Sequence, residues 1–230
     1  MVDEVKTPTA RRYRSARRAE QAAGTRHRIL AAAQALFTEH GYTATSVAQI
    51  AARAEVAVDT LYATVGRKPA LLRELLEAAL SGADETVPAE QRDYVRIIRA
   101  VGTAGEKIAV YAEAVARIGF RMAPVHRALA EAALRDSGCA ALRGQISARR
   151  AANMRLFAAD LRATGELRAD LTDDDVADII WSMNAAEYYA LLVGERGWTA
   201  ERFQAWLVDA WTRTLLGSPE SSEEDGRRAR

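Results

Sequence analysis

The 230-residue chain has little cysteine, little histidine and no long apolar run, and each shortage excludes a class of protein. The single cysteine, Cys139, excludes an intramolecular disulfide framework and favours a buried, inert thiol in a reducing compartment. The three histidines, His27, His40 and His126, lie in separate segments without the spacing of metal ligands. No apolar run approaches the roughly 20 residues of a membrane span, and the arginine-rich start lacks the apolar segment of a secretory signal. We therefore expect a soluble, cytoplasmic protein with no metal site and no membrane partner.

The sequence also lacks the common enzymatic motifs. It contains no phosphate loop, no dinucleotide-binding fingerprint and no nucleophile elbow. The acidic run 173–175 suggests a metal site at first sight. Because Thr172 precedes it and an apolar periodic segment follows, the run is more typical of a helix start. We expect no enzymatic activity and no cofactor.

Composition favours a helical protein with a sizeable core. Hydrophobic residues make up 49% of the chain, enough for one or two domains, and alanine is abundant. Glycine and proline divide the region after residue 84 into about six helices, with breaks expected near 102–105, at Pro124, and near 137–138, 165 and 194–197. No strand-like alternation is present. The predicted fold class is all-α.

Residues 45–68 predict two short helices joined by a tight turn. Val47, Ile50, Ala51 and Ala54 recur at helical spacing, and Thr45 and Ser46 are N-cap candidates in front of them. The three residues 55–57 form the connection, and the range 58–65 is a second helix of about two turns. Such an arrangement is typical of a helix-turn-helix that reads DNA.

The second short helix offers polar side chains to a DNA groove. Leu61 and Val65 fall on one face, which leaves Asp59, Thr60, Tyr62 and Ala63 for contacts outside the domain. The hydroxyls of Thr60 and Tyr62 can bond phosphate oxygens, and Lys68 stands just before Pro69 at the start of the next helix. Asp59 either sets base preference or assists the helix start through its charge, and both interpretations remain open.

The stretch TRHRILAAAQALFTEHGYTATSVAQIAARAEVAVDTLYATVGRKPALLRELLEAAL, from Thr25 to Leu80, resembles the N-terminal domain of the TetR family of bacterial transcriptional regulators. The resemblance implies a three-helix DNA-binding domain over residues 25–80, including the connecting helix. It implies that Thr45 caps a helix against phosphate, that Thr60 and Tyr62 contact the DNA backbone, and that Lys68 is an anchor. The remaining candidates for DNA contact are Ser46 and the base-facing positions Val58, Asp59 and Ala63. The chain departs from the family pattern at Glu55, Ala57 and Thr64-Val65, where glycine, serine and an aromatic pair are usual.

Positive charge is concentrated at the start of the chain. The first 28 residues hold eight basic and three acidic side chains, whereas the whole chain carries only +1. Residues 1–24 are therefore expected to form a basic, largely disordered arm, in which Arg14, Arg17 and Arg18 are candidates for minor-groove contacts. The alternative is a solvated tail without a role in DNA binding.

A larger helical domain is expected over residues 84–216, followed by a disordered tail over 217–230. Its last helices carry wide apolar faces with three tryptophans, which either fill the core or form a subunit interface. We expect both, with Tyr188, Leu192, Trp206 and Ala210 in a homodimer interface, as the resemblance implies.

The same resemblance implies a small-molecule effector pocket in the larger domain. From the sequence alone, aromatic and methionine residues at helical spacing are more often plain core. The candidate lining residues are Tyr111, Phe120, Met122, His126, Met154, Phe157, Trp181 and Asn184.

The predicted function is a homodimeric transcriptional regulator, most simply a repressor that a small molecule releases from a palindromic double-stranded DNA operator. Two alternatives remain. One is a ligand-blind regulator or an activator, and the other is an enzyme or carrier in which the helix-turn-helix is a structural relic.

Overall fold

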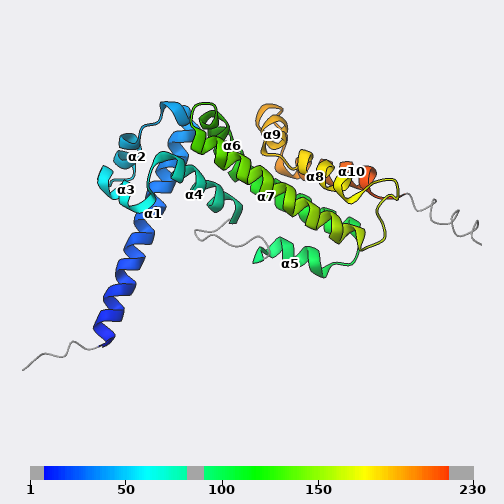
Figure 1. The fold of residues 1–230 in the computed structure, drawn as a ribbon, viewed down its shortest axis with the longest axis horizontal. Coiled ribbons are helices and arrows are strands. Elements are labelled where there is room, and N and C mark those ends of the chain that lie inside the picture. Colours follow the sequence, from blue (N-terminus) through cyan, green and yellow to red (C-terminus); the bar gives the residue numbers. More distant parts are fainter. Residues whose placement is uncertain (1–7, 82–90, 218–230) are drawn as a thin grey trace, which may run out of the picture. The chain divides into compact units, whose positions relative to one another are not determined.

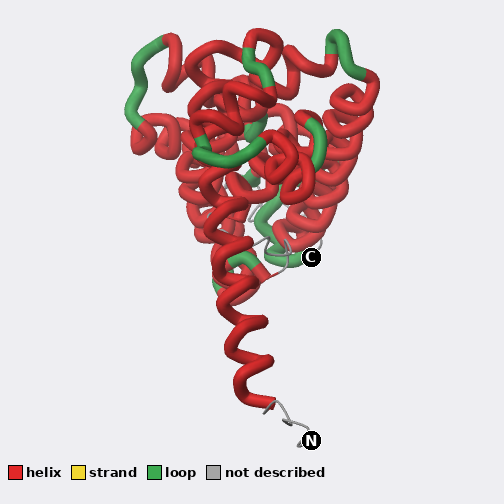
Figure 2. Tube along the Cα trace, turned by 90° about the vertical axis from the view of Figure 1, so that its left-hand side faces the viewer, coloured by secondary structure: helices red, strands yellow, loops and turns green. Residues whose placement is uncertain are grey.

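The computed structural model describes residues 8–81 and 91–217, and every regular element in these ranges is a helix (Figures 1 and 2). The predicted all-α class is confirmed. One isolated bridge joins Leu167 to Leu216. The helices are α1 (Pro8–Ala44), α2 (Val47–Arg53), α3 (Val58–Val65), α4 (Lys68–Ser81), α5 (Asp93–Ala100), α6 (Ala104–Ala133), α7 (Ser137–Arg162), α8 (Asp173–Met183), α9 (Ala186–Tyr189), a π-helix (Ala190–Glu195) and α10 (Ala200–Leu215).

The chain forms two compact units that divide between Leu76 and Glu77. The division falls inside α4, a few residues before the domain boundary that the sequence suggested after Leu80. α4 therefore begins in the first unit and ends in the second, as one continuous helix. The expected tail lies outside the described residues, apart from Gly217.

The basic arm is more ordered than the sequence suggested. α1 is helical from Pro8, so the prediction of a largely disordered arm is wrong for residues 8–24, while residues 1–7 lie outside the described part. Alanine and arginine are good helix formers, and they continue the helix that the buried residues after Thr25 begin. Near its other end, Gly41 has φ +78° and breaks the helical path before Tyr42.

The first unit has a core built from α1 to α4. Helices α1, α2 and α3 pack on one another. Ile29 of α1, Ile50 of α2 and Leu61 of α3 are all fully buried. The predicted spacing of Ile50 and Leu61 on inward faces is thus confirmed, and the opposite faces of the two short helices point to solvent.

The second unit is a bundle in which α6 packs against α7 and α10, and α7 packs against α8 (Figure 1). Capping boxes start two of these helices, from Thr103 with Glu106 and from Thr172 with Asp175. The second box confirms that the acidic run 173–175 begins a helix.

Pro124 does not end a helix, contrary to the sequence prediction. α6 continues through it to Ala133 and is 30 residues long. Proline inside a helix costs about 3 kcal/mol. Burial of Met122, Val125 and Leu129 on both sides of Pro124 offsets that cost, because these side chains reach the core only if the helix continues.

The centre of the second unit is aromatic. Trp211 and Phe203 of α10 are fully buried, and the Tyr111 ring stacks on Trp211 with ring centroids 5.7 Å apart. Over the described ranges, none of the helices combines the length and apolar character needed to cross a membrane.

Candidate functional site

α3 presents a polar, exposed face in the first unit. Its bounds, Val58–Val65, are those the sequence predicted. Leu61 and Val65 are buried on the inner side. The outer residues are exposed, with Tyr62 47% and Val58 38% accessible, and the set comprises Val58, Asp59, Thr60, Tyr62 and Ala63. All five positions of α3 that were expected to contact DNA are therefore accessible on its outer side.

The start of α2 differs from the prediction in one residue. Ser46 is the N-cap: its Oγ accepts a hydrogen bond from the Gln49 backbone at 3.2 Å, and Gln49 Oε1 accepts from the Ser46 backbone at 2.7 Å. Thr45 is 1% exposed, and its hydroxyl donates to the carbonyl oxygens of Leu36 and Gly41. The expected role of Thr45 in binding phosphate is thus wrong for this arrangement, because the hydroxyl is turned into the protein.

The turn between α2 and α3 contains a strained residue. Glu55 has φ +56°, a left-handed conformation that a non-glycine residue adopts at a cost. Ala57 occupies the N-cap of α3 and provides no side-chain hydrogen bond. Asp59 is the acidic residue of the first turn, where its charge favours the helix N-terminus.

Lys68 is held inside the first unit. Its Nζ donates to the Tyr42 carbonyl oxygen at 2.5 Å and lies 4.0 Å from the centre of the Tyr42 ring. The side chain therefore ties the start of α4 to the exit from α1. If Lys68 also anchors DNA, the same ammonium group serves both DNA binding and the contact with Tyr42.

The arginines proposed for the arm lie on the helical extension of α1. Arg17 and Arg18 are exposed, and the side chain of Arg14 lies outside the described part. No acidic side chain among those described forms an ion pair with Arg17 or Arg18, so their charge is available to an outside polyanion.

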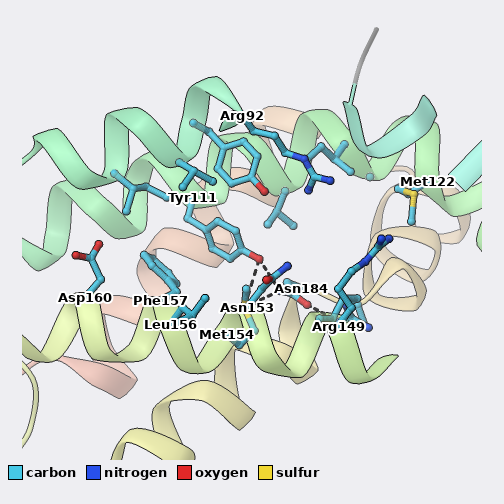
Figure 3. Close-up of a pocket in the computed structure, with 18 of the residues that line it drawn as sticks. Arg92, Tyr111, Met122, Arg149, Asn153, Met154, Leu156, Phe157, Asp160 and Asn184 are labelled. Carbon is cyan, nitrogen blue, oxygen red and sulfur yellow. Dashed lines mark hydrogen bonds between the residues drawn. The ribbon is translucent and has the colours of Figure 1, made fainter. Parts of the chain in front are cut away.

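The second unit contains a cavity of about 550 Å³ (Figure 3). Its walls come from α5, α6, α7 and the segment between α8 and α9. Five of the eight residues predicted for a pocket are among its apolar and polar lining: Tyr111, Met122, His126, Met154 and Phe157. Asn184, the C-cap of α8, is a sixth. A volume of this size is typical of sites for small organic molecules.

The two remaining predictions differ. Phe120 is 74% exposed and does not line the cavity, because it falls on the outer face of α6 between the inward residues Gly119 and Met122. Trp181 lines a second cavity of about 560 Å³, which shares His126 and Arg150 with the first. Sequence periodicity identified the helix but not which side of it faces inward.

A hydrogen-bonded network occupies the centre of the cavity wall. Asn184 Nδ2 donates to the Tyr111 hydroxyl at 2.7 Å and approaches the Met154 sulfur at 3.1 Å. Arg150 donates to Asn184 Oδ1, and also to the Trp181 carbonyl oxygen at 2.7 Å. Figure 3 shows Tyr111 and Asn184 pointing toward one another from opposite sides.

Burial shifts the protonation of two groups in this wall. It raises the pKa of Tyr111 well above its usual value, so the hydroxyl stays neutral. Burial also lowers the pKa of His126 below its usual value; the Glu187 carboxylate, 3.6 Å from Nδ1, opposes that shift, while Arg150 and Arg143 add to it.

The sequence reasoning missed the basic residues of the cavity. Arg92, Arg149 and Arg150 line it, and Lys107 lies buried beside it, donating to the Ile98 carbonyl oxygen and to Asp160. The sequence does show the adjacent pair Arg149-Arg150 in an otherwise small-residue stretch of α7. It does not show that this pair faces α5 and α6. No cluster of potential metal ligands occurs within the described ranges.

Two of the four predicted dimer residues, Tyr188 and Trp206, belong to a partly exposed aromatic cluster. Tyr188 is 38% exposed, and its ring stacks on Trp206 at 5.8 Å, while Trp198 meets Trp206 edge to face. Leu192 and Ala210 are half-buried. Trp211 belongs to the core, so the three tryptophans divide between core and surface.

Comparisons with known proteins agree with this architecture. Residues 29–75 match the model of bacterial regulatory proteins of the tetR family. Similar solved structures include a proposed transcriptional regulator from Saccharomonospora viridis in complex with choline (16% identity, 84% of this chain and 98% of that one, TM-score 0.63). SmeT in complex with triclosan is also similar (16% identity, 85% of this chain and 93% of that one, TM-score 0.62). So is a proposed TetR-family regulator from Mesorhizobium loti (16% identity, 85% of this chain and 98% of that one, TM-score 0.62). No curated protein sequence gives a match.

The matched residues include all of α2 and α3, and the structural likeness extends to the fold of the second unit. The family consists of DNA-binding regulators rather than enzymes. The helix-turn-helix and its matched flanking helices identify residues 29–75 as a DNA-binding domain of the TetR type, and the protein as a DNA-binding transcriptional regulator.

Proposed function

We propose that this regulator is a homodimeric, ligand-responsive repressor, which binds a short palindromic operator and leaves it when a small molecule enters the 550 Å³ cavity. The cavity carries the proposal, because it is large, lined by aromatic and polar side chains, and located in a unit separate from α2 and α3. Two similar structures hold small molecules, choline in one and triclosan in the other.

The exposed face of α3 is the proposed reader of bases. In this proposal the exposed residues Asp59 and Ala63 meet base edges, and the hydroxyls of Thr60 and Tyr62 bond phosphate. Ser46 caps the start of α2, and its backbone N–H and hydroxyl both donate to Gln49 Oε1. An anionic phosphate at this helix N-terminus would replace that side chain as the acceptor.

Dimer formation would use the aromatic cluster of Tyr188 and Trp206. Large aromatic side chains that remain partly exposed are typical of interface anchors. Two-fold symmetry would place a pair of α3 helices in successive major grooves, about 34 Å apart, which is why the operator is expected to be palindromic.

The proposed coupling runs through the end of α4. Within the second unit, Arg149 lines the cavity and its Nη1 lies 2.8 Å from Glu77 Oε1 of α4, while Arg121 Nε donates to the Ala79 carbonyl oxygen at 3.1 Å. A ligand that draws Arg149 away would loosen the end of α4, the helix whose first turns belong to the first unit. Couplings of about 1–3 kcal/mol change affinity roughly 5- to 150-fold, which is enough to switch a promoter.

The test is a titration of the purified protein into labelled DNA from its own upstream region and into a scrambled duplex, followed by fluorescence anisotropy at two salt concentrations. Selective binding that weakens as salt rises is expected, because phosphate contacts release counterions. Thr60→Ala should weaken binding to the specific duplex. Thr38→Ala is the matched control, since this exposed hydroxyl donates to its own helix at Gln34.

The same assay tests the ligand response. Addition of an effector should lower operator affinity without changing the fold. If no selected DNA sequence binds at low salt, the proposal fails entirely. If DNA binds selectively but no compound that occupies the cavity alters the affinity, the protein is a ligand-blind regulator. If ligand raises operator affinity, the regulator is not released by its effector.

A further inference from the structure

The cavity of the second unit carries an excess of positive charge. Four arginines line it, Arg92, Arg99, Arg149 and Arg150. Its single carboxylate, Asp160, is already occupied by the buried Lys107, whose Nζ lies 3.1 Å from Asp160 Oδ2. A ligand that enters this space therefore meets several cations and no unpaired acid.

Two of these arginines form no ion pair with the acidic side chains that the structure describes. Arg92, at the start of α5, has a buried Nε without a hydrogen-bond acceptor. Arg150 makes both of its hydrogen bonds through Nη2, to neutral oxygens of Trp181 and Asn184. Burying a guanidinium is unfavourable, and burial lowers the pKa of Arg150, a shift that Tyr111 and the more distant Glu187 carboxylate oppose without cancelling it. An anion in the cavity would relieve this cost.

The remaining walls are apolar and aromatic. The Tyr111 ring packs against Phe157, with centroids 4.8 Å apart, and against Tyr94 at 6.2 Å. In Figure 3, Arg92 comes from one wall, and Met154 and Arg149 come from the opposite one, so the charged groups border the aromatic surface. Such a lining suits a molecule with an apolar or aromatic body and one negatively charged end.

We infer that the effector of this regulator is an amphipathic carboxylate, held by charge pairing with Arg92 and Arg150 and by packing of its body on Tyr94, Tyr111 and Phe157. The inference rests on the proposed function for its biological meaning, although binding itself is tested without DNA. Guanidinium groups favour carboxylates because the two planar groups can form paired hydrogen bonds. A quaternary ammonium ligand is disfavoured, since the aromatic rings that would attract it stand beside Arg92 and Arg150, which have no ion-pair partner among the described side chains.

The inference is tested by calorimetric titration of the full-length protein with two matched probe series. One series is 4-phenylbutyrate, its amide and 4-phenylbutylamine; the other is decanoate, decanamide and decyltrimethylammonium. The acids should bind at least about tenfold more tightly than the matched amides, corresponding to about 1.4 kcal/mol, and the cations should bind most weakly. The inference is overturned if an amide or a cation equals its matched acid, or if neither acid binds at millimolar concentration.

Variants locate the charge that is recognised. Arg92→Gln and Arg150→Gln should each lower acid affinity by about tenfold and leave amide affinity unchanged, so that acid and amide converge. Arg155→Gln is the matched control on α7, because this arginine lies outside the cavity, is 62% exposed and pairs with Asp174. Circular dichroism identifies a variant that does not fold, and Arg92 provides an independent position outside the Asn184 network. If Arg92→Gln and Arg150→Gln both fold and both bind the acids as tightly as wild type does, the assignment is excluded.

These outcomes separate the two proposals. If the protein binds the acids tightly but stays bound to its operator DNA, the carboxylate site stands and the release mechanism is excluded. If an amide releases the protein from DNA and the matched acid does not, the release mechanism stands and the carboxylate site is excluded.

Discussion

Gly119 of α6 lies directly against the Tyr189 ring of α9, so closely that a Cβ atom on Gly119 would be only 2.3 Å from Tyr189 Cδ2. The ring cannot retreat easily, because it is buried and meets Phe203 edge to face at 5.3 Å. Both residues also line the cavity. The close approach of two helices therefore depends on the missing side chain.

Gly119→Ala should lower the free energy of unfolding by about 1–3 kcal/mol, since overpacking forces neighbouring groups off their preferred positions. Thermal denaturation measures the change. Gly105→Ala on the same helix is the control, because a Cβ there meets no atom within 4 Å. It should be neutral or stabilise by up to about 1 kcal/mol through helix propensity. Equal melting temperatures for the two variants would contradict the packing argument.

Lys68→Ala should weaken DNA binding and also destabilise the first unit. The ammonium donates to the Tyr42 carbonyl oxygen and stands over the Tyr42 ring, contacts whose loss costs about 1–3 kcal/mol. Tyr62→Phe removes only an exposed hydroxyl from α3 and should weaken DNA binding with no change in melting temperature. An unchanged melting temperature for Lys68→Ala would show that the contact to Tyr42 contributes nothing to stability.

Glu77→Gln should lower operator affinity in the absence of ligand, by about fivefold or more, if the ion pair with Arg149 holds α4 in the DNA-binding arrangement. Anisotropy titration against the selected operator measures the effect. Asp174→Asn is the control, because its ion pair with Arg155 joins two exposed side chains of α7 and α8. Identical operator affinities for wild type and Glu77→Gln would remove Glu77 from the coupling.

The sequence predicted the first unit better than the second for a physical reason. In α2 and α3 the buried residues, Ile50 with Ala51 and Leu61 with Val65, are set among exposed positions, so the helical period alone indicates the buried face. The helical extension of α1 was missed because arginine and alanine suit a helix and a charged arm equally well.

The cavity residues were predictable only in part. α7 shows little separation of apolar and charged faces, so the inward direction of Arg149 and Arg150 cannot be read from its period. Pro124 was misleading for a related reason, since tertiary burial outweighed its local cost. The polar network of Arg150 and Asn184 joins residues 34 positions apart, which no local pattern reveals.

Glu55→Gly should stabilise the first unit modestly, because glycine adopts the φ of +56° without steric cost. The relief of about 1–2 kcal/mol is reduced by the larger chain entropy of glycine, about 0.5–1 kcal/mol. Glu55→Val should destabilise instead, since a β-branched side chain is poorly tolerated at positive φ. Chemical denaturation of the three proteins should therefore rank glycine above glutamate and glutamate above valine. The reverse ranking would mean that the turn does not keep this conformation in solution.

The stability of the second unit should decrease as pH falls from about 7.5 through the ordinary histidine pKa of 6.5 and below it. Burial lowers the pKa of His126, so below pH 6.5 the unfolded chain binds a proton that the folded protein resists. The contribution is fully present above the unfolded pKa and is lost as pH falls toward the folded one. Glu187 limits the shift, whereas Arg143 and Arg150 add to it.

Denaturant midpoints of wild type and His126→Gln, measured at intervals from pH 8 to 5.5, test this prediction. The midpoint should depend less on pH in His126→Gln than in wild type. His27→Gln, in the first unit, is the matched control and should leave the slope of the second unit unchanged. Parallel curves for wild type and His126→Gln would show that another group causes the pH dependence.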